Sequence, residues 1–219
     1  MKHLARFLAA LLVLATMAPF TIAHFKLLEP PSAIVERDNG DPQKMAPCGG
    51  NSANAARGTA ADLGMPSNIV TKIRGGTKMH LKVQETIYHP GHYRVALAVN
   101  SRSELPKDPE VTTAESARGP QSVSAVIQNP VRPPLLADGL WAHSTRPTGA
   151  LPPWETDIDI PNINCEKCTL QIIQFMAEHG LNRDGDFSYH HCADLQITAD
   201  PAKPLDTRWA APPARGGGR

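Results

Sequence analysis

Residues 79–99, MHLKVQETIYHPGHYRVALAV, decide the fold of this protein. Apolar and polar residues alternate over 79–84 and again over 93–99, and a period of two is typical of half-buried β-strands. The residues between these runs end in His-Pro-Gly-His at 89–92, a combination that favours a tight turn. We therefore expect an antiparallel hairpin with His89 at its corner.

The rest of the chain repeats this pattern of short strands and turns. Clusters of Pro, Gly, Asn and Asp separate the alternating segments and long helical patterns are scarce, which predicts an all-β antiparallel sandwich. Further strands are expected at 122–128, 154–160, 169–176 and 192–198. Long loops are expected at 28–70, 100–121 and 129–153.

The two ends of the chain carry different expectations. Lys2 and Arg6 precede an apolar run, and a small-x-small cleavage pattern follows it, so residues 1–23 predict a signal peptide. The apolar run has about 11 residues, against the roughly 20 needed to span a membrane, which disfavours an anchor. We expect a secreted or periplasmic protein with one domain over 24–199 and a disordered tail over 200–219.

The charge balance limits the classes of partner. The chain carries 22 Lys and Arg residues and 21 Asp and Glu residues, so its net charge is close to zero. This balance favours neither a nucleic-acid partner nor an anionic membrane surface for the mature protein. The sequence also offers no obvious acid–base pair of carboxylates for ordinary glycoside hydrolysis.

Four cysteines in an exported chain predict two disulfides, for which three connectivities exist. Cys165 and Cys168 form a CxxC, but the second CxxC of a structural zinc site and the βαβ pattern of a thioredoxin are both missing. We favour a local bridge, Cys165–Cys168, and a long-range bridge, Cys48–Cys192.

Cleavage after Ala23 would make His24 the first residue of the mature chain. Its α-amino group, with a pKa of about 7.7–8, and its ring Nδ1 can then chelate one metal ion. One further histidine opposite them completes three nitrogens in a T shape, an arrangement that favours copper. His89 at the expected hairpin corner is the preferred partner, and His92 in the same turn is the alternative.

Three short motifs resemble the lytic polysaccharide monooxygenases and their bacterial, chitin-binding type-4-like relatives. They are His24 itself, His-Pro-Gly-His-Tyr at 89–93 and Tyr-His-His-Cys-Ala-Asp at 189–194. The resemblance implies an immunoglobulin- or fibronectin III-like sandwich that binds one copper ion per chain. His24 and His89 would be its histidine ligands, and Tyr189 would stand in the axial position.

The same resemblance implies a reaction and partners. An external electron donor would reduce the copper, and a C–H bond beside a glycosidic link of a chitin- or cellulose-like polysaccharide would be hydroxylated, which breaks the chain. We expect the protein to act as a monomer. The cysteine of the final-strand motif commonly pairs with one in the long early loop, which supports the Cys48–Cys192 bridge.

One position departs from the fungal cellulose-active members of this family. Phe187 stands where they commonly carry a glutamine, two residues before Tyr189. Another residue therefore has to supply the hydrogen bond to bound oxygen. The candidates are Gln174, His179 and Glu85.

The chain is poor in the aromatic rings that usually form flat binding faces for crystalline polysaccharide. Trp141 and Trp154 are expected to anchor the core or the loops, and Trp209 lies in the expected tail. Phe25 and Tyr88 are the rings that would contribute surface beside the metal.

Three other interpretations stay open. A non-catalytic copper-binding or transport protein would use the same ligands, and the spare His92, His190 and His191 suit metal capture. A plain carbohydrate-binding or adhesive sandwich would make His24 incidental. A zinc site at His190 and His191 is disfavoured because adjacent strand residues point to opposite faces, and parity puts His191 on the side of Tyr189.

Overall fold

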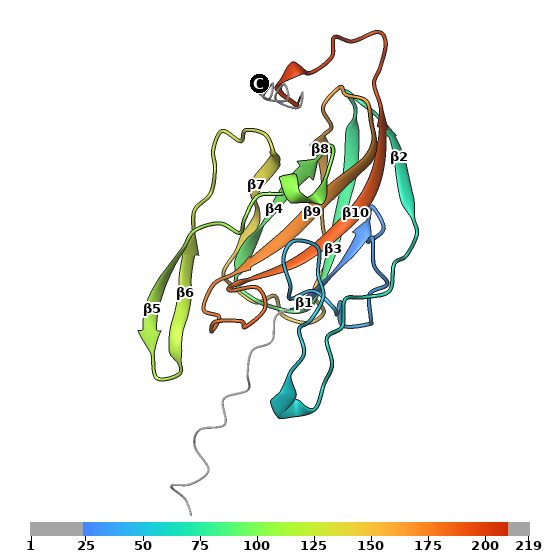
Figure 1. Cartoon of the computed structure of the whole chain (residues 1–219). Coiled ribbons are helices and arrows are strands. Elements are labelled where there is room, and N and C mark those ends of the chain that lie inside the picture. Colours follow the sequence, from blue (N-terminus) through green and yellow to red (C-terminus); the bar gives the residue numbers. More distant parts are fainter. Residues whose placement is uncertain (1–23, 210–219) are drawn as a thin grey trace, which may run out of the picture.

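The fold consists of β-strands and short 3₁₀ turns. The computed structural model describes residues 24–209, and within this range there is no α-helix and no helix long and apolar enough to cross a membrane (Figure 1). The elements in chain order are β1 (His24–Glu29), η1 (Ala55–Arg57), β2 (Val70–Arg74), β3 (Lys78–Ile87), β4 (Gly91–Ala98), η2 (Arg102–Glu104), β5 (Val111–Ser116), β6 (Gly119–Ala125), β7 (Leu135–His143), β8 (Trp154–Asp159), β9 (Cys165–Met176), β10 (Ser188–Thr198) and η3 (Thr207–Trp209).

Two sheets pack face to face around one core. The first has the strand order β1-β3-β8, and the second has the order β2-β10-β9-β4-β7. Neighbouring strands are antiparallel except for β2 and β10, which run parallel. The buried apolar cluster draws on both sheets, with Phe25 and Leu81 from the first and Val95 and Ile172 from the second. The predicted all-β sandwich with long loops is thus confirmed.

The alternation in the opening stretch of sequence governs β3. Met79, Leu81, Val83 and Glu85 are buried, while the residues between them are partly or fully exposed. One face of β3 therefore points into the core, as a period of two requires. The same alternation carries a carboxylate, that of Glu85, into the interior near the hairpin corner.

The middle strands of the five-stranded sheet, β4, β9 and β10, are buried on both faces. The loop before β5 lies against their outer face, whereas the two-stranded sheet β5-β6 projects away from the sandwich (Figure 1). Arg94 of β4 donates to the carbonyl of Lys107 at 2.7 Å, and His190 of β10 contacts Asp108 at 2.9 Å. This double covering explains why burial along β9 and β10 is nearly continuous instead of alternating.

The sequence does not predict β1, β2, β5 and β7. The stretches 100–121 and 129–153, expected to be loop-rich, also contain β5 and β7. β5 is exposed along nearly its whole length and β7 pairs with a broken register, so neither shows a clean alternation. Residues 30–69 hold no strand and match most of the loop expected over 28–70.

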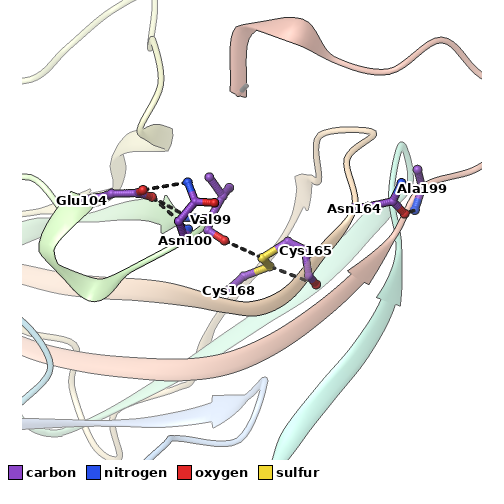
Figure 2. Close-up of a disulfide and its surroundings, with 7 residues drawn as sticks. All are labelled: Val99, Asn100, Glu104, Asn164, Cys165, Cys168 and Ala199. Carbon is purple, nitrogen blue, oxygen red and sulfur yellow. Dashed lines mark hydrogen bonds between the residues drawn. A yellow bond between two sulfur atoms is a disulfide. The ribbon is translucent and has the colours of Figure 1, made fainter. Parts of the chain in front are cut away.

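Both predicted disulfides are confirmed. Cys48–Cys192 ties the long early loop to β10. Cys165–Cys168 lies at the start of β9, where Cys165 Sγ is 3.0 Å from the carbonyl oxygen of Val99 (Figure 2). Because β9 runs on to Met176 at the hairpin corner, the local bridge is roughly 35 Å along the strand from that corner.

The first part of the expected tail packs on the sandwich. Residues 200–209 lie against the sandwich, where Asn162 Nδ2 donates to the carbonyl of Lys203 at 2.9 Å and Trp209 packs on the core. The buried amide of Asn162 fixes this segment because it finds its hydrogen-bond partners there. The rest of the expected tail and the predicted signal peptide lie outside the described residues.

Candidate metal centre

His24 begins β1 and lies inside the molecule. It is opposite Ile87 of β3, and only 3% of its surface is exposed. Its ring packs edge-on against Tyr189 of β10, with 5.5 Å between the ring centroids. His24 therefore lies at a buried junction between the two sheets.

The two ring nitrogens of His24 have different surroundings. Nε2 lies 3.3 Å from Oδ1 of Asp41, whereas Nδ1 is buried and has no hydrogen-bond partner among residues 24–209. Burial raises the pKa of Asp41, but contacts with His24, Asn39 and Lys44 outweigh it and lower that pKa to about 2. An ionised carboxylate beside Nε2 favours a proton there, which leaves the lone pair on Nδ1.

His89 occupies the corner between β3 and β4 and is 2% exposed. Burial, together with the nearby His179, lowers the pKa of His89 to about 4, so the ring is neutral at physiological pH. Its Nδ1 lies 3.3 Å from the carbonyl oxygen of Pro90 and donates to it in this neutral form. Such a bond leaves the lone pair on Nε2, which is the arrangement that metal-binding histidines share.

His179 and Tyr189 lie between these two histidines. Glu178, with a left-handed φ of 58°, turns the chain just after β9. The His179 ring is then 5.0 Å from the His89 ring and 6.2 Å from the Tyr189 ring. Burial, with the charge of two nearby carboxylates, raises the pKa of the Tyr189 phenol, which is therefore neutral.

His24, Tyr189, His179 and His89 thus form a continuous row of four rings, called the ring cluster below. Within residues 24–209, no three His, Cys, Asp or Glu side chains are grouped as a metal site. The ligand set expected from the sequence needs only two such side chains, because the terminal amine supplies the third nitrogen. The buried, unpartnered Nδ1 of His24 fits this set, since a metal ion would give that atom the partner it lacks.

His92 lies on the other face of its sheet. Side chains alternate along β4, so His92 points outward while Tyr93 points into the core. The His92 ring is 5.1 Å from that of Phe175 and lines a groove of about 700 Å³ bordered by β4, β6 and β7. The structure therefore brings His89, and not His92, to the ring cluster.

Gln174 and Glu85 meet in the core beside the ring cluster. Gln174 is directly opposite Tyr189 in the pairing of β9 with β10. Its Nε2 donates to Oε1 of Glu85 at 2.9 Å, and the hydroxyl of Tyr93 donates to the same oxygen at 3.1 Å. Two of the expected hydrogen-bonding candidates are thus engaged with each other, whereas the third, His179, lies in the cluster itself.

His143 is a candidate that sequence reasoning missed. Its Nε2 lies 2.7 Å from the carbonyl oxygen of His89 and 3.0 Å from Oε1 of Glu85, and its Nδ1 lies 2.7 Å from the carbonyl of Trp141. Burial lowers its pKa, but Glu85 and the two carbonyls outweigh burial and raise it. His143 stands in a stretch without alternation, so no sequence signal connects it to the hairpin corner.

The residues that follow Tyr189 on β10 confirm the expected alternation of faces. His191 shares the inner face with Tyr189, and its Nε2 lies 3.1 Å from the carbonyl oxygen of Phe25. His190 points to the outer face, where Nε2 contacts Asp108 at 2.9 Å. The two rings face different layers, so they do not meet at one ion.

The aromatic rings near the cluster are mostly internal. Phe25 is 0% exposed, which corrects the expectation that it adds surface beside the metal. Tyr88 is partly exposed, although its hydroxyl is buried. Trp141 and Trp154 pack against the core as expected, and Trp209 does so too, in contrast to its expected place in a disordered tail.

Comparisons with known proteins leave the family open. No family model matches the sequence, and no curated protein matches it. A similar solved structure is a chitin binding domain from Burkholderia pseudomallei, with 10% sequence identity and a TM-score of 0.41, and the match covers 81% of this chain and 100% of that chain. Likeness to the monooxygenases therefore rests on the three motifs.

Proposed function

We propose that the protein is a secreted, copper-dependent lytic polysaccharide monooxygenase-like enzyme with one copper ion per chain. The observation that carries the proposal is the Nδ1 atom of His24, which is buried, has no hydrogen-bond partner among residues 24–209, and belongs to the same ring cluster as His89. Removal of the predicted signal peptide after Ala23 would add a free α-amino group to this same residue.

The chain offers three nitrogens and one phenol to copper. The α-amino group and Nδ1 of His24 would bind from one residue, and Nε2 of His89 would add the third nitrogen. Tyr189 would add a weak oxygen ligand, because its raised pKa keeps the phenol neutral. Bound copper would supply one-electron redox chemistry for oxygen activation, with electrons from an external donor.

The surrounding residues hold these ligands and exclude water. Asp41 holds the His24 ring through Nε2, and the Pro90 carbonyl holds the His89 ring through Nδ1. Burial of both rings keeps bulk water away from their inner sides. His179 is half-buried beside His89, so it is the side chain placed to hydrogen-bond a small molecule bound next to the ligands.

The substrate class is supported by the motifs, which imply a chitin- or cellulose-like polysaccharide. The surface supports a second candidate, a non-catalytic copper-binding or transport protein. Among residues 24–209, none of the exposed large hydrophobic side chains is aromatic. A flat polysaccharide would therefore find no row of exposed rings, whereas delivery or storage of copper needs none.

Turnover with a reductant separates the two candidates. The copper-loaded protein is incubated with ascorbate and oxygen on chitin, cellulose and xylan, and His89→Ala serves as the control. If the protein is an enzyme, it should form oxidised oligosaccharides and H₂O₂, and the control should form neither. One-to-one copper binding without any product would establish the carrier instead. If the mass of the secreted protein shows that the mature chain begins at Phe25 or later, both candidates are overturned.

A further inference from the structure

β7 contains a bulge opposite the start of β4. Gly91 pairs with His143 and Tyr93 pairs with Leu140, so two residue steps on β4 match three on β7. The extra residue falls next to Trp141, whose φ of 50° is in the left-handed region. A bulge of this kind breaks the side-chain alternation and re-aims the residues that follow it.

The bulge turns His143 into the sandwich. Alternation from the inward-facing Leu140 would otherwise place His143 on the outer face. Instead its side chain is 7% exposed, and its ring stacks on Trp154 with 5.0 Å between centroids and 20° between planes. Trp154 belongs to β8 of the other sheet, so the His143 ring lies between the two sheets.

Both ring nitrogens of His143 face oxygen acceptors. Nδ1 meets the Trp141 carbonyl, and Nε2 meets the His89 carbonyl and the Glu85 carboxylate. Carbonyl oxygens only accept hydrogen bonds, so each ring nitrogen of His143 is placed to donate one. The Glu85 carboxylate, 3.0 Å from Nε2, holds the ring in this place.

The backbone of the hairpin corner is held at two points. At Gly91 the chain lies so close to β9 that a Cβ atom would be 1.9 Å from the carbonyl oxygen of Phe175. At His89 the carbonyl accepts the 2.7 Å bond from His143. These two contacts fix the backbone of the hairpin corner. This backbone in turn places the His89 ring in the ring cluster.

We propose that His143 is a positioning residue for His89, presented by the β7 bulge and anchored by Glu85. Its Nε2–H holds the His89 carbonyl and so orients the imidazole that faces His179 in the ring cluster. This inference rests on the proposed function, because His89 needs a fixed orientation only if it binds copper. The contact between His143 and His89 is nevertheless present in the metal-free protein.

The rival account is that His143 only fills the core and supports the bulge. Two isosteric substitutions separate the accounts. In His143→Gln the amide nitrogen reaches the place of Nε2 and can still donate to the His89 carbonyl. In His143→Asn it reaches the place of Nδ1 and can donate only to the Trp141 carbonyl.

The test compares metal-free and copper-loaded proteins. The ¹⁵N-labelled imidazole resonances of His89 are recorded without metal, and copper affinity and the Cu(II) EPR spectrum are then measured on the same samples. His190→Asn is the matched control, because it removes an Nε2–carboxylate contact of another histidine ring, on the outer face of the second sheet. Glu85→Gln is a second variant in case His143→Asn does not fold.

His143→Asn is expected to broaden or shift the His89 resonances, weaken copper binding about 10-fold and alter the EPR spectrum. His143→Gln should restore all three readouts toward wild type, while His190→Asn should lower only the melting temperature. Glu85→Gln, which replaces the carboxylate that contacts Nε2 of His143, should behave as His143→Asn does.

Two results would overturn the inference. One is an equal effect of the Gln and Asn variants, which would reduce His143 to a core residue. The other is unchanged His89 resonances in whichever of His143→Asn and Glu85→Gln folds. Failure of the proposed copper site looks different, because wild type itself would then bind no copper while the metal-free His89 resonances still report on His143. Failure of the enzymatic proposal alone would appear as copper binding without product and would leave all these readouts unchanged.

Discussion

Oδ1 of Asp41 lies 3.3 Å from Nε2 of His24 and so occupies the side of the ring that faces away from the unpartnered Nδ1. The carboxylate therefore selects the tautomer with a free lone pair on the chelating nitrogen. This relationship connects the irregular early loop, which carries Asp41, to the metal chemistry proposed for the first strand.

Asp41→Asn is expected to weaken copper binding about 10-fold, as the loss of a bond to the far nitrogen of a ligand histidine does. The reason is that a neutral amide no longer favours the proton on Nε2. Competition with a chelator of known affinity measures the effect. Asp62→Asn, which removes an exposed ion pair with Arg37 from the same loop, is the control. Equal affinity of Asp41→Asn and wild type would contradict the tautomer assignment.

The choice between His89 and His92 gives a second prediction. His89→Ala should lose tight copper binding and change the Cu(II) EPR spectrum, because its ring lies in the ring cluster. His92→Ala should leave both unchanged, because its ring lies on the outer face against Phe175. The reverse outcome would show that the hairpin corner rearranges when copper binds.

Glu36 predicts a pH dependence of stability. It lies 3.1 Å from His191, and burial raises its pKa from 4.5 to about 7 despite hydrogen bonds that lower it. For an acid whose pKa is higher in the folded state, the contribution to the free energy of unfolding is fully present below pH 4.5. This contribution of Glu36 is lost as the pH rises through about 7.

Glu36→Gln should abolish this loss without changing the shape of the side chain. Urea unfolding at pH 8 should show the variant more stable than wild type by up to about 3 kcal/mol, and at pH 4 the gain should vanish. Burial lowers the pKa of His191 to about 4, so this ring is neutral at pH 8 and the comparison at that pH reports on Glu36. A gain of the same size at both pH values would refute the assignment.

The two disulfides should differ in their effect on stability. Cys48–Cys192 closes a sequence separation of 144 residues, and Cys165–Cys168 closes one of 3. The chain-entropy treatment predicts that replacing the long-range bridge with two alanines lowers the free energy of unfolding by about 5 kcal/mol, against about 2 kcal/mol for the local one. Chemical unfolding of the two double variants measures this, and a larger loss from the local bridge would contradict it.

Much of the fold was predictable because burial on one face imposes alternation. β3 follows this rule from Met79 onward, and the two disulfides followed from the even cysteine count and the motif around Cys192. β7 was not predictable, because Gly139 and the bulge at Trp141 interrupt its alternation. β1 is short, and its role depends on pairing with β3, which the sequence alone does not display.

The candidate site was predictable to the extent that it depends on local motifs. His24, His89 and Tyr189 come from such motifs, and the structure connects them through His179 in one cluster. His143 could not be found in this way, since only the register of β7 against β4 brings it to His89.

Copper binding by two forms of the protein that differ only at the amino end tests the central claim most directly. One form begins at His24, and the other retains Ala23 before it, which blocks the α-amino group and leaves every side chain in place. Calorimetric titration should show one tight copper site in the first form and its loss in the second. Equal, tight binding by both forms would contradict the chelate of amine and imidazole on which the account depends.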